Sequence, residues 1–221
     1  ANNPPGLSDR LIARGCVIGA DEAGYGPNLG PLVVSVTRWE LPGPPQAFDL
    51  AHALRSSVST ESARDGRLFI ADSKRVYQPG QGLAGLERSV LALLAAAGRR
   101  PRRGIELQSA VSPRGMEGAL DELPPWYREV DVELPYAADA AEVEVTAERL
   151  LDNLAAEGGR LAALESDVVC EPRFNRLVDL AGSKGGVLTD VTLELVGSHW
   201  RGAAAGTVHV LCDEHGGRIQ S

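Results

Sequence analysis

Two pairs of adjacent carboxylates follow apolar, strand-like segments of the sequence. Residues 15–20, GCVIGA, run into Asp21-Glu22, and residues 207–212, TVHVLC, run into Asp213-Glu214. Short apolar runs of this kind predict buried β-strands, and strand ends are common ligand sites in open α/β sheets. The pattern predicts a carboxylate site built from two strand ends. Solvated turns after two strands are the alternative.

Such a site would suit hard divalent cations. Carboxylate oxygens without accompanying cysteine or clustered histidine ligands favour Mg²⁺ or Mn²⁺ over zinc. Mg²⁺ keeps waters and takes further ligands from substrate phosphate, so this acidic site would also be a phosphate site. Adjacent residues on a strand point to opposite faces. We therefore expect a local bend, provided by Gly24 and Gly26, to bring Asp21 and Glu22 to one site.

A glycine-rich turn comes directly after the first acidic pair. Residues 24–31, GYGPNLGP, hold three glycines and two prolines, and residues 31–39 form a β-branched apolar run. This order predicts a β-hairpin. The glycine spacing matches neither a Walker loop nor a dinucleotide fingerprint. The turn is either a tight hairpin alone or a place where a polymer backbone approaches main-chain N–H groups.

The remaining pattern predicts alternating helices and strands. Helices are expected over residues 48–54, 83–97 and 141–157, the last with Val145, Leu150, Leu151 and Leu154 on one face. A strand is expected over residues 161–169, and one long helix or two shorter ones over residues 174–200. Residues 99–159 differ in composition, with a basic start and several prolines. We interpret them as an insertion within one domain.

Composition excludes several classes of protein. The 221 residues are 43% hydrophobic and 24% charged, as in ordinary globular chains. A net charge of −8 removes the basic footprint of a typical nucleic-acid-binding domain. The three widely spaced cysteines indicate no disulfide framework, so we expect a cytoplasmic protein. We expect Cys170 and Cys212 to be small, buried apolar residues. No apolar run is long enough for a membrane span, so we expect no membrane partner.

The quoted motifs resemble one family, the type 2 ribonucleases H (ribonucleases HII and HIII). Residues 19–34, GADEAGYGPNLGPLVV, followed by ADSK at residues 71–74, are similar to the opening of that family. Residues 174–200 and the strand that ends at Asp213 are similar to its later helix and strand. The resemblance covers roughly residues 15–98 and 160–217, and its first motif is the most specific.

The resemblance implies a ribonuclease H-like fold, a mixed five-stranded sheet with flanking helices. It implies a hydrolase acting as a metal-dependent endonuclease, which cuts the RNA strand of an RNA–DNA hybrid or a ribonucleotide-containing DNA duplex with two metal ions. Lys74, Arg75 and the basic run at residues 99–103 would be available for backbone contacts. The implied metal ligands and catalytic residues are Asp21, Glu22 and Asp213, and the implied substrate contacts are Gly24, Tyr25, Gly26, Ser73 and Lys74.

Two departures from the family pattern bear on activity. Tyr25 replaces the usual glycine-flanked arginine or lysine, and it would either stack on a sugar or base or fill the hairpin. The family also has a fourth acidic residue on a helix after the third catalytic acid, whereas eight residues follow Asp213 here. We therefore expect residues 1–221 to form one domain that is incomplete at the C-terminus.

Three functions stay open on the sequence. The first is the metal-dependent endonuclease. The second is a non-catalytic, nucleic-acid-binding relative of the same fold, favoured by Tyr25 and by the missing fourth acid. The third is a metal-dependent phosphoesterase acting on small phosphorylated substrates, which the acidic strand ends alone would also allow.

Overall fold

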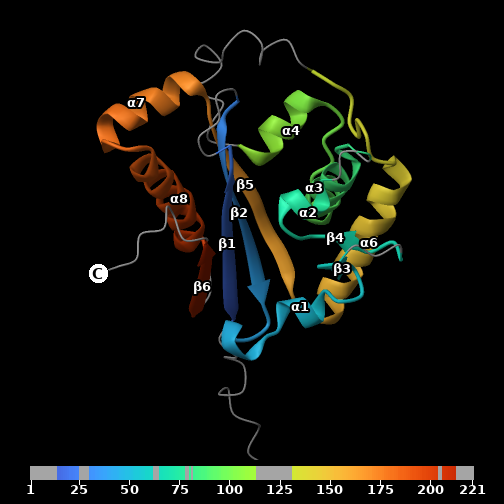
Figure 1. Ribbon diagram of the computed structural model, residues 1–221. Coiled ribbons are helices and arrows are strands. Elements are labelled where there is room, and N and C mark those ends of the chain that lie inside the picture. Colours follow the sequence, from blue (N-terminus) through green and yellow to red (C-terminus); the bar gives the residue numbers. More distant parts are fainter. Residues whose placement is uncertain are drawn as a thin grey trace, which may run out of the picture.

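The centre of the computed structural model is a β-hairpin (Figure 1). Strand β1 (Gly15–Ala23) pairs antiparallel with β2 (Leu32–Leu41), which confirms the predicted hairpin. Asp21 and Glu22 lie within β1 rather than after it, because both remain paired with β2. The structure describes residues 14–24, 30–61, 65–77, 80, 82–112, 131–203 and 206–212.

Two further strands extend the hairpin into a mixed sheet. Strand β5 (Arg160–Val169) pairs antiparallel with β2, and β6 (Thr207–Cys212) pairs parallel with β1. The resulting order is β5-β2-β1-β6. Short strands β3 (Val58–Ser59) and β4 (Leu68–Phe69) form a separate pair. The predicted α/β class, with a mixed sheet and flanking helices, is confirmed, and the described residues supply four strands of the main sheet.

Two helices, α7 (Glu171–Ala181) and α8 (Lys184–Arg201), cover one face of the sheet (Figure 1). Alternate residues of β1 and β2, among them Ile18 and Val34, form a buried cluster with Leu188 of α8. The sequence left open one helix or two in this region. Gly182 ends α7 with φ +72°, and the Ser183 side chain accepts a hydrogen bond from the backbone of the next helix, so there are two.

The opposite face carries a layer of longer and shorter helices (Figure 1). Its cluster joins Trp39 of β2, Leu68 of β4 and Leu150 of α6, all buried. None of the helices in the described ranges is long and apolar enough to cross a membrane. The helices of this layer and its margins are η2 (Pro45–Ala47), α1 (Leu50–Ala53), α2 (Ser73–Val76), α3 (Ala84–Ala96), α4 (Gly104–Val111) and α6 (Ala140–Ala156).

Helix α6 occupies its predicted range but buries a different face. Val145 and Leu151, expected in the core, are 55% and 40% exposed. The buried stripe is instead Val143, Thr146, Ala147, Leu150 and Leu154, at helical spacing. Leu150 and Leu154 share a cluster with Ala92 and Ala95 of α3. This part of segment 99–159 therefore belongs to the core of the helical layer.

The cysteines divide into two kinds. Cys16 and Cys170 are buried, the latter as predicted, whereas Cys212 is exposed and the expectation of burial is wrong there. The reason is topological, because Cys212 ends β6, which lies at the edge of the described sheet. Burial raises the pKa of the Cys16 and Cys170 thiols above the ordinary value.

We expect iodoacetamide to modify one thiol of the native protein quickly and two slowly. Cys212 should react first because it is exposed, while Cys16 and Cys170 are shielded and held protonated, and the thiolate is the nucleophile. Peptide mass spectrometry after timed alkylation measures this. The Cys212→Ser variant should lose the fast phase, and fast labelling of Cys16 would contradict the packing of β1.

Candidate functional site

Asp21 borders a hollow on the sheet. The hollow has a volume of about 460 Å³ and is lined by Gly19, Ala20, Asp21, Ser35, Thr37, Leu211 and Cys212. Asp21 lies opposite Ser35, and Gly19 lies opposite Thr37. Apart from Leu211, the lining side chains are small, which leaves the space open. Asp21 is exposed, and its Oδ1 accepts a hydrogen bond of 2.8 Å from the backbone N–H of Glu22.

Glu22 lies on the other side of the strand. The pairing of β1 with β2 is continuous through Asp21 and Glu22, so the two carboxylates project to opposite faces. The bend expected to unite them is not found before Ala23. The Oε2 atom of Glu22 is buried and has no hydrogen-bond partner among the described residues. A buried carboxylate oxygen without a donor is unfavourable, so this position fits a cation or a hydrogen-bond donor.

Strand β6 approaches the same point of the sheet. Its parallel register runs from Thr207 beside Gly15 to Cys212 beside Ala20, the residue before Asp21. Asp213 follows Cys212 in the sequence and lies outside the described residues. Within the described ranges, no three histidine, cysteine or acidic side chains are grouped as a metal would need. Of the three predicted metal ligands, the structure describes Asp21 and Glu22.

Gly24 is required by the geometry of the hairpin. Its φ is +80°, and a Cβ atom added there would lie 2.3 Å from the carbonyl oxygen of Pro31. Both facts explain a glycine at this position without reference to a ligand. Tyr25 and Gly26, the other predicted contacts in the turn, lie outside the described residues.

The segment containing Ser73 and Lys74 forms the start of α2. The Asp72 carboxylate caps this short helix by accepting a 2.8 Å hydrogen bond from the backbone N–H of Lys74. Ser73 and Lys74 are exposed. Among the described residues, the Lys74 ammonium takes part in no ion pair, which leaves it available to an anionic ligand.

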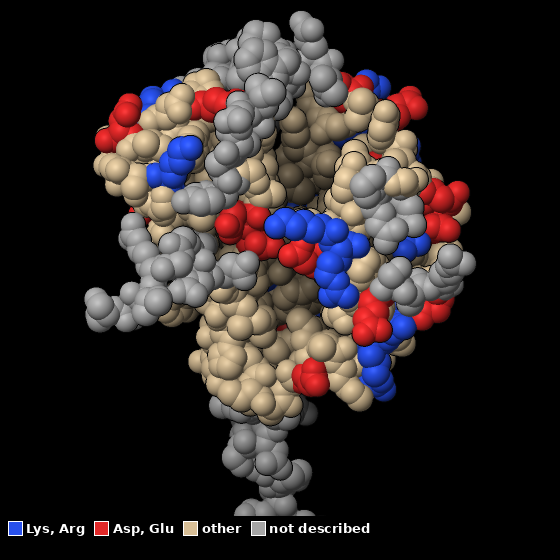
Figure 2. Space-filling view, in the orientation of Figure 1, with Lys and Arg blue, Asp and Glu red and all other residues tan. Residues whose placement is uncertain are grey.

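Helix α2 belongs to the layer on the side of the sheet that Asp21 faces. Val17, four residues before Asp21 on β1, points to the same side and packs against the cluster that contains Leu68 of β4. Ile70, three residues before α2, packs against the same cluster. Figure 2 shows acidic and basic side chains side by side near the centre of the visible face, over the region of β1 and α2 in Figure 1. Acidic and basic side chains therefore lie close to one another on this face of the molecule.

The basic run at residues 99–103 is largely engaged with the protein itself. Three of its four arginines bind other parts of the chain, so the expectation that the whole run is available for backbone contacts is wrong. The hydrogen bond from Arg103 holds the pKa of its partner Asp131 below the ordinary value. The partners are the carbonyl oxygens of Ala110 and Leu164 for Arg99, Glu144 for Arg100 and Asp131 for Arg103.

Sequence reasoning missed the hydroxyl groups around the hollow. Ser35 shares a 2.9 Å hydrogen bond with Ser166, which is its partner on β5, so Asp21, Ser35 and Ser166 form a polar row across three strands. It also missed Glu171, which accepts a hydrogen bond of 3.2 Å from the backbone N–H of Gly30 and ties the hairpin to α7. The alternation of polar residues in residues 31–39 was the signal for the first.

Comparisons of the chain with family models, with curated proteins and with solved structures found no match. The resemblance to type 2 ribonucleases H therefore depends on the motifs themselves.

We expect Gly24→Ala to lower the free energy of unfolding by about 1–3 kcal/mol, because a side chain would meet positive φ and the Pro31 carbonyl together. Urea unfolding followed by circular dichroism measures the loss. Gly43→Ala is the matched control, since nothing lies within 4 Å of its added Cβ. Equal stability of the two variants would show that the hairpin tolerates a side chain at Gly24.

Proposed function

We propose that this chain is a metal-dependent endonuclease of the type 2 ribonuclease H kind, hydrolysing the RNA strand of RNA–DNA hybrids. The observation that carries the proposal is the position of Asp21, exposed beside an open hollow on the central strand. The neighbouring strand β6 runs parallel to β1 and ends one residue before Asp213. In this proposal Asp213, which follows β6 in the sequence, supplies a second carboxylate to the site at Asp21.

The proposed metal ligands are Asp21, Glu22 and Asp213. The oxygen-only donor set suits Mg²⁺ or Mn²⁺, and the buried, unpartnered Oε2 of Glu22 fits a group that supplies positive charge. When bound, such ions would activate water and stabilise the leaving 3′ oxygen. Continuing the β6 register by one residue would bring Asp213 beside Asp21, which is why we assign it to the same site.

The chain's own groups would orient the substrate. Gly19 has no side chain and those of Ser35 and Thr37 are small, which leaves room beside Asp21 for a sugar and its phosphate. The exposed Lys74, together with Ser73, would contact a backbone phosphate. The Gly24-Tyr25-Gly26 backbone would lie along the strand being cut, with Gly24 fixing the direction of the turn.

The ribonuclease H-like fold is part of the same proposal. The sheet has β5, β2 and β1 paired antiparallel in that order and β6 parallel beside β1, with helices on both faces. This arrangement is compatible with the ribonuclease H-like sheet that the motifs imply. In this proposal residues 1–221 form one such domain, and residues 99–159 are an insertion that packs within it.

A second candidate is a relative that binds nucleic acid without cutting it. The observation that favours it is the regular pairing of β1, which leaves Asp21 and Glu22 on opposite faces. A nuclease must bring both carboxylates to the metals when substrate is bound. A binding protein has no such requirement.

We expect the protein, with Mg²⁺ or Mn²⁺, to cleave a DNA duplex that contains an RNA tract or one ribonucleotide. Asp21→Asn should reduce the cleavage rate at least about 100-fold, because a metal ligand loses its charge. Gel analysis of end-labelled duplex measures the rate, and circular dichroism verifies folding.

Asp152→Asn is the matched control, since Asp152 is exposed on α6 outside the site and its substitution removes the same charge. Binding of the hybrid without cleavage by the wild-type chain would favour the second candidate. Cleavage by Asp21→Asn at the wild-type rate would refute the site.

We expect Lys74→Gln to weaken hybrid binding and to reduce the slope of log affinity against log salt by about one, as for loss of one phosphate contact. Fluorescence anisotropy across a salt series measures both. The chain has one other lysine, Lys184, which begins α8 on the other face of the sheet. Lys184→Gln should leave the slope unchanged, and an unchanged slope for Lys74→Gln would remove Lys74 from the interface.

A further inference from the structure

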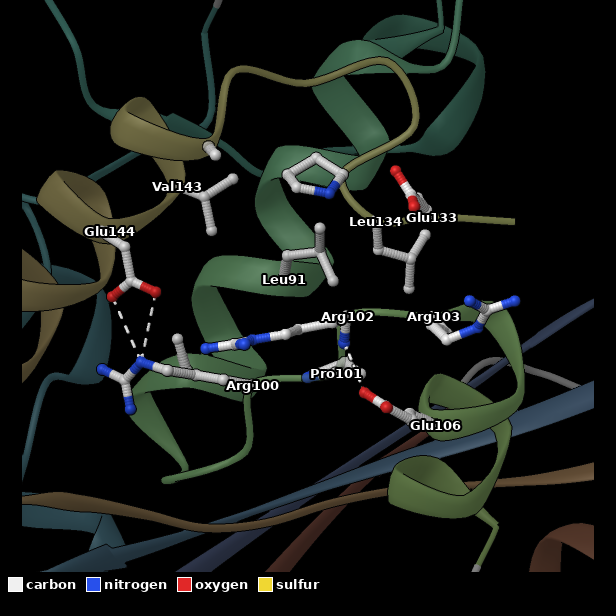
Figure 3. Close-up of a pocket in the computed structure, with 13 residues that line it drawn as sticks. Leu91, Arg100, Pro101, Arg102, Arg103, Glu106, Glu133, Leu134, Val143 and Glu144 are labelled. Atoms are coloured by element: carbon white, nitrogen blue, oxygen red, sulfur yellow. Dashed lines mark hydrogen bonds and ion pairs between the residues drawn. The ribbon is translucent and has the colours of Figure 1, made fainter. Parts of the chain in front are cut away.

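A second cavity lies within the helical layer, away from the hollow at Asp21. It has a volume of about 570 Å³, and none of its lining residues borders the hollow. Helices α3 and α6, the N-terminal end of α4 and the segment before α6 line it, and it opens to solvent (Figure 3). Its size is within the range of pockets that hold small organic molecules, roughly 300–1,000 Å³.

The pocket combines an apolar surface with a charged rim. Leu91 of α3 and Val143 of α6 are buried, and Leu134 faces them from the segment before α6 (Figure 3). The rim is mostly charged and contains three arginines and three glutamates. A ligand with an apolar body and one polar end would match this division.

Most of the rim charges are already engaged. The Nε atom of Arg100 lies 3.2 Å from both carboxylate oxygens of Glu144. The Nε atom of Arg103 lies 2.6 Å from Asp131. Glu106 accepts a 2.7 Å hydrogen bond from the backbone N–H of Arg102. A ligand is therefore not expected to bind first to these carboxylate and guanidinium groups, because they already bind one another or the backbone.

Arg102 is different. Among the described residues, its guanidinium has no hydrogen-bond or ion-pair partner, and Figure 3 shows the side chain extending across the pocket below Leu91. Glu133 also lacks a side-chain partner in the described part of the chain, and it lies on the far side of the pocket from the Arg102 guanidinium (Figure 3). One anionic group of a ligand would be attracted to Arg102. A second anionic group would be repelled by the Glu133 carboxylate. The pocket thus favours a single negative charge.

The walls of the pocket are fixed by backbone contacts. The carbonyl oxygen of Arg102 accepts from the N–H of Leu134, and the N–H of Gly104 donates to Val132, both at 2.9 Å. The Glu87 carboxylate accepts three backbone hydrogen bonds from residues 136–138. A preformed pocket loses little entropy when a ligand binds.

We infer that this pocket binds a small monocarboxylate with an apolar body, the carboxylate facing Arg102 and the body packing on Leu91, Leu134 and Val143. A planar carboxylate matches the guanidinium fork in two parallel hydrogen bonds. The inference is independent of the proposed nuclease site, because the two share no residue.

The probe is 3-phenylpropionate, titrated into the full chain and followed by calorimetry and by ligand-observed NMR. We expect saturable binding, and at least about tenfold weaker binding of the neutral 3-phenylpropanamide and of the Arg102→Gln variant, as for loss of one charge-assisted contact. Arg201→Gln, an exposed arginine on α8, is the matched control and should bind as wild type. Glu133→Gln should improve binding of the doubly charged phenyl phosphate.

Three results would overturn the inference: no saturable binding of 3-phenylpropionate to the wild-type chain, equal affinity for the acid and its amide, or unchanged affinity in Arg102→Gln. Circular dichroism of each variant verifies folding, and Arg102 is exposed, so its substitution leaves the core intact. Hybrid cleavage, measured on the same samples, reports separately on the proposed nuclease site.

Discussion

The period-two alternation of β1 is the constraint on which both the core and the site depend. Ile18 and its neighbours at even positions are buried against α8, while Val17 packs toward the helical layer on the other face. Asp21 has the parity of Val17. A one-residue change of register would turn the buried set outward and carry Asp21 into the α8 interface, which is strongly unfavourable. The packing of the strand therefore determines which face the carboxylate occupies.

Side-chain size along the same face explains why there is a hollow at Asp21. Val17 lies opposite Trp39, which belongs to the buried cluster beneath α3 and α6, and Val17 packs against that cluster. The next pair on this face is Gly19 with Thr37, followed by Asp21 with Ser35. Volume decreases and polarity increases from one end of the hairpin to the other. The covered end supplies hydrophobic stability, and the open end can accept a ligand because no large side chain fills it.

The sequence was sufficient for the order and type of the main elements, because their apolar periodicity is local. It was insufficient where a distant partner decides the outcome. Asp21 and Glu22 stay in β1 because β2 continues to pair with them. Val145 of α6 is exposed because α3 packs against the side of α6 that carries Ala147. In the sequence alone, the side that carries Val145 looks equally apolar. Arg103 and Arg100 form ion pairs with acidic residues 28 and 44 positions away in the sequence, and such distant pairing cannot be predicted from residue spacing.

The ion pairs of these arginines affect how a chain with net charge −8 could bind a polyanion such as a nucleic acid. Arginines engaged with Asp131 and Glu144 stabilise the segment around α4 and α6, so they contribute little to an electrostatic surface for nucleic acid. The exposed Lys74 lies on α2, in the layer that Asp21 faces. Affinity for a hybrid would then depend on a few local cations and on bound metal rather than on a broad basic surface. Such a site would be strongly sensitive to the loss of any one of them, because no general attraction would compensate.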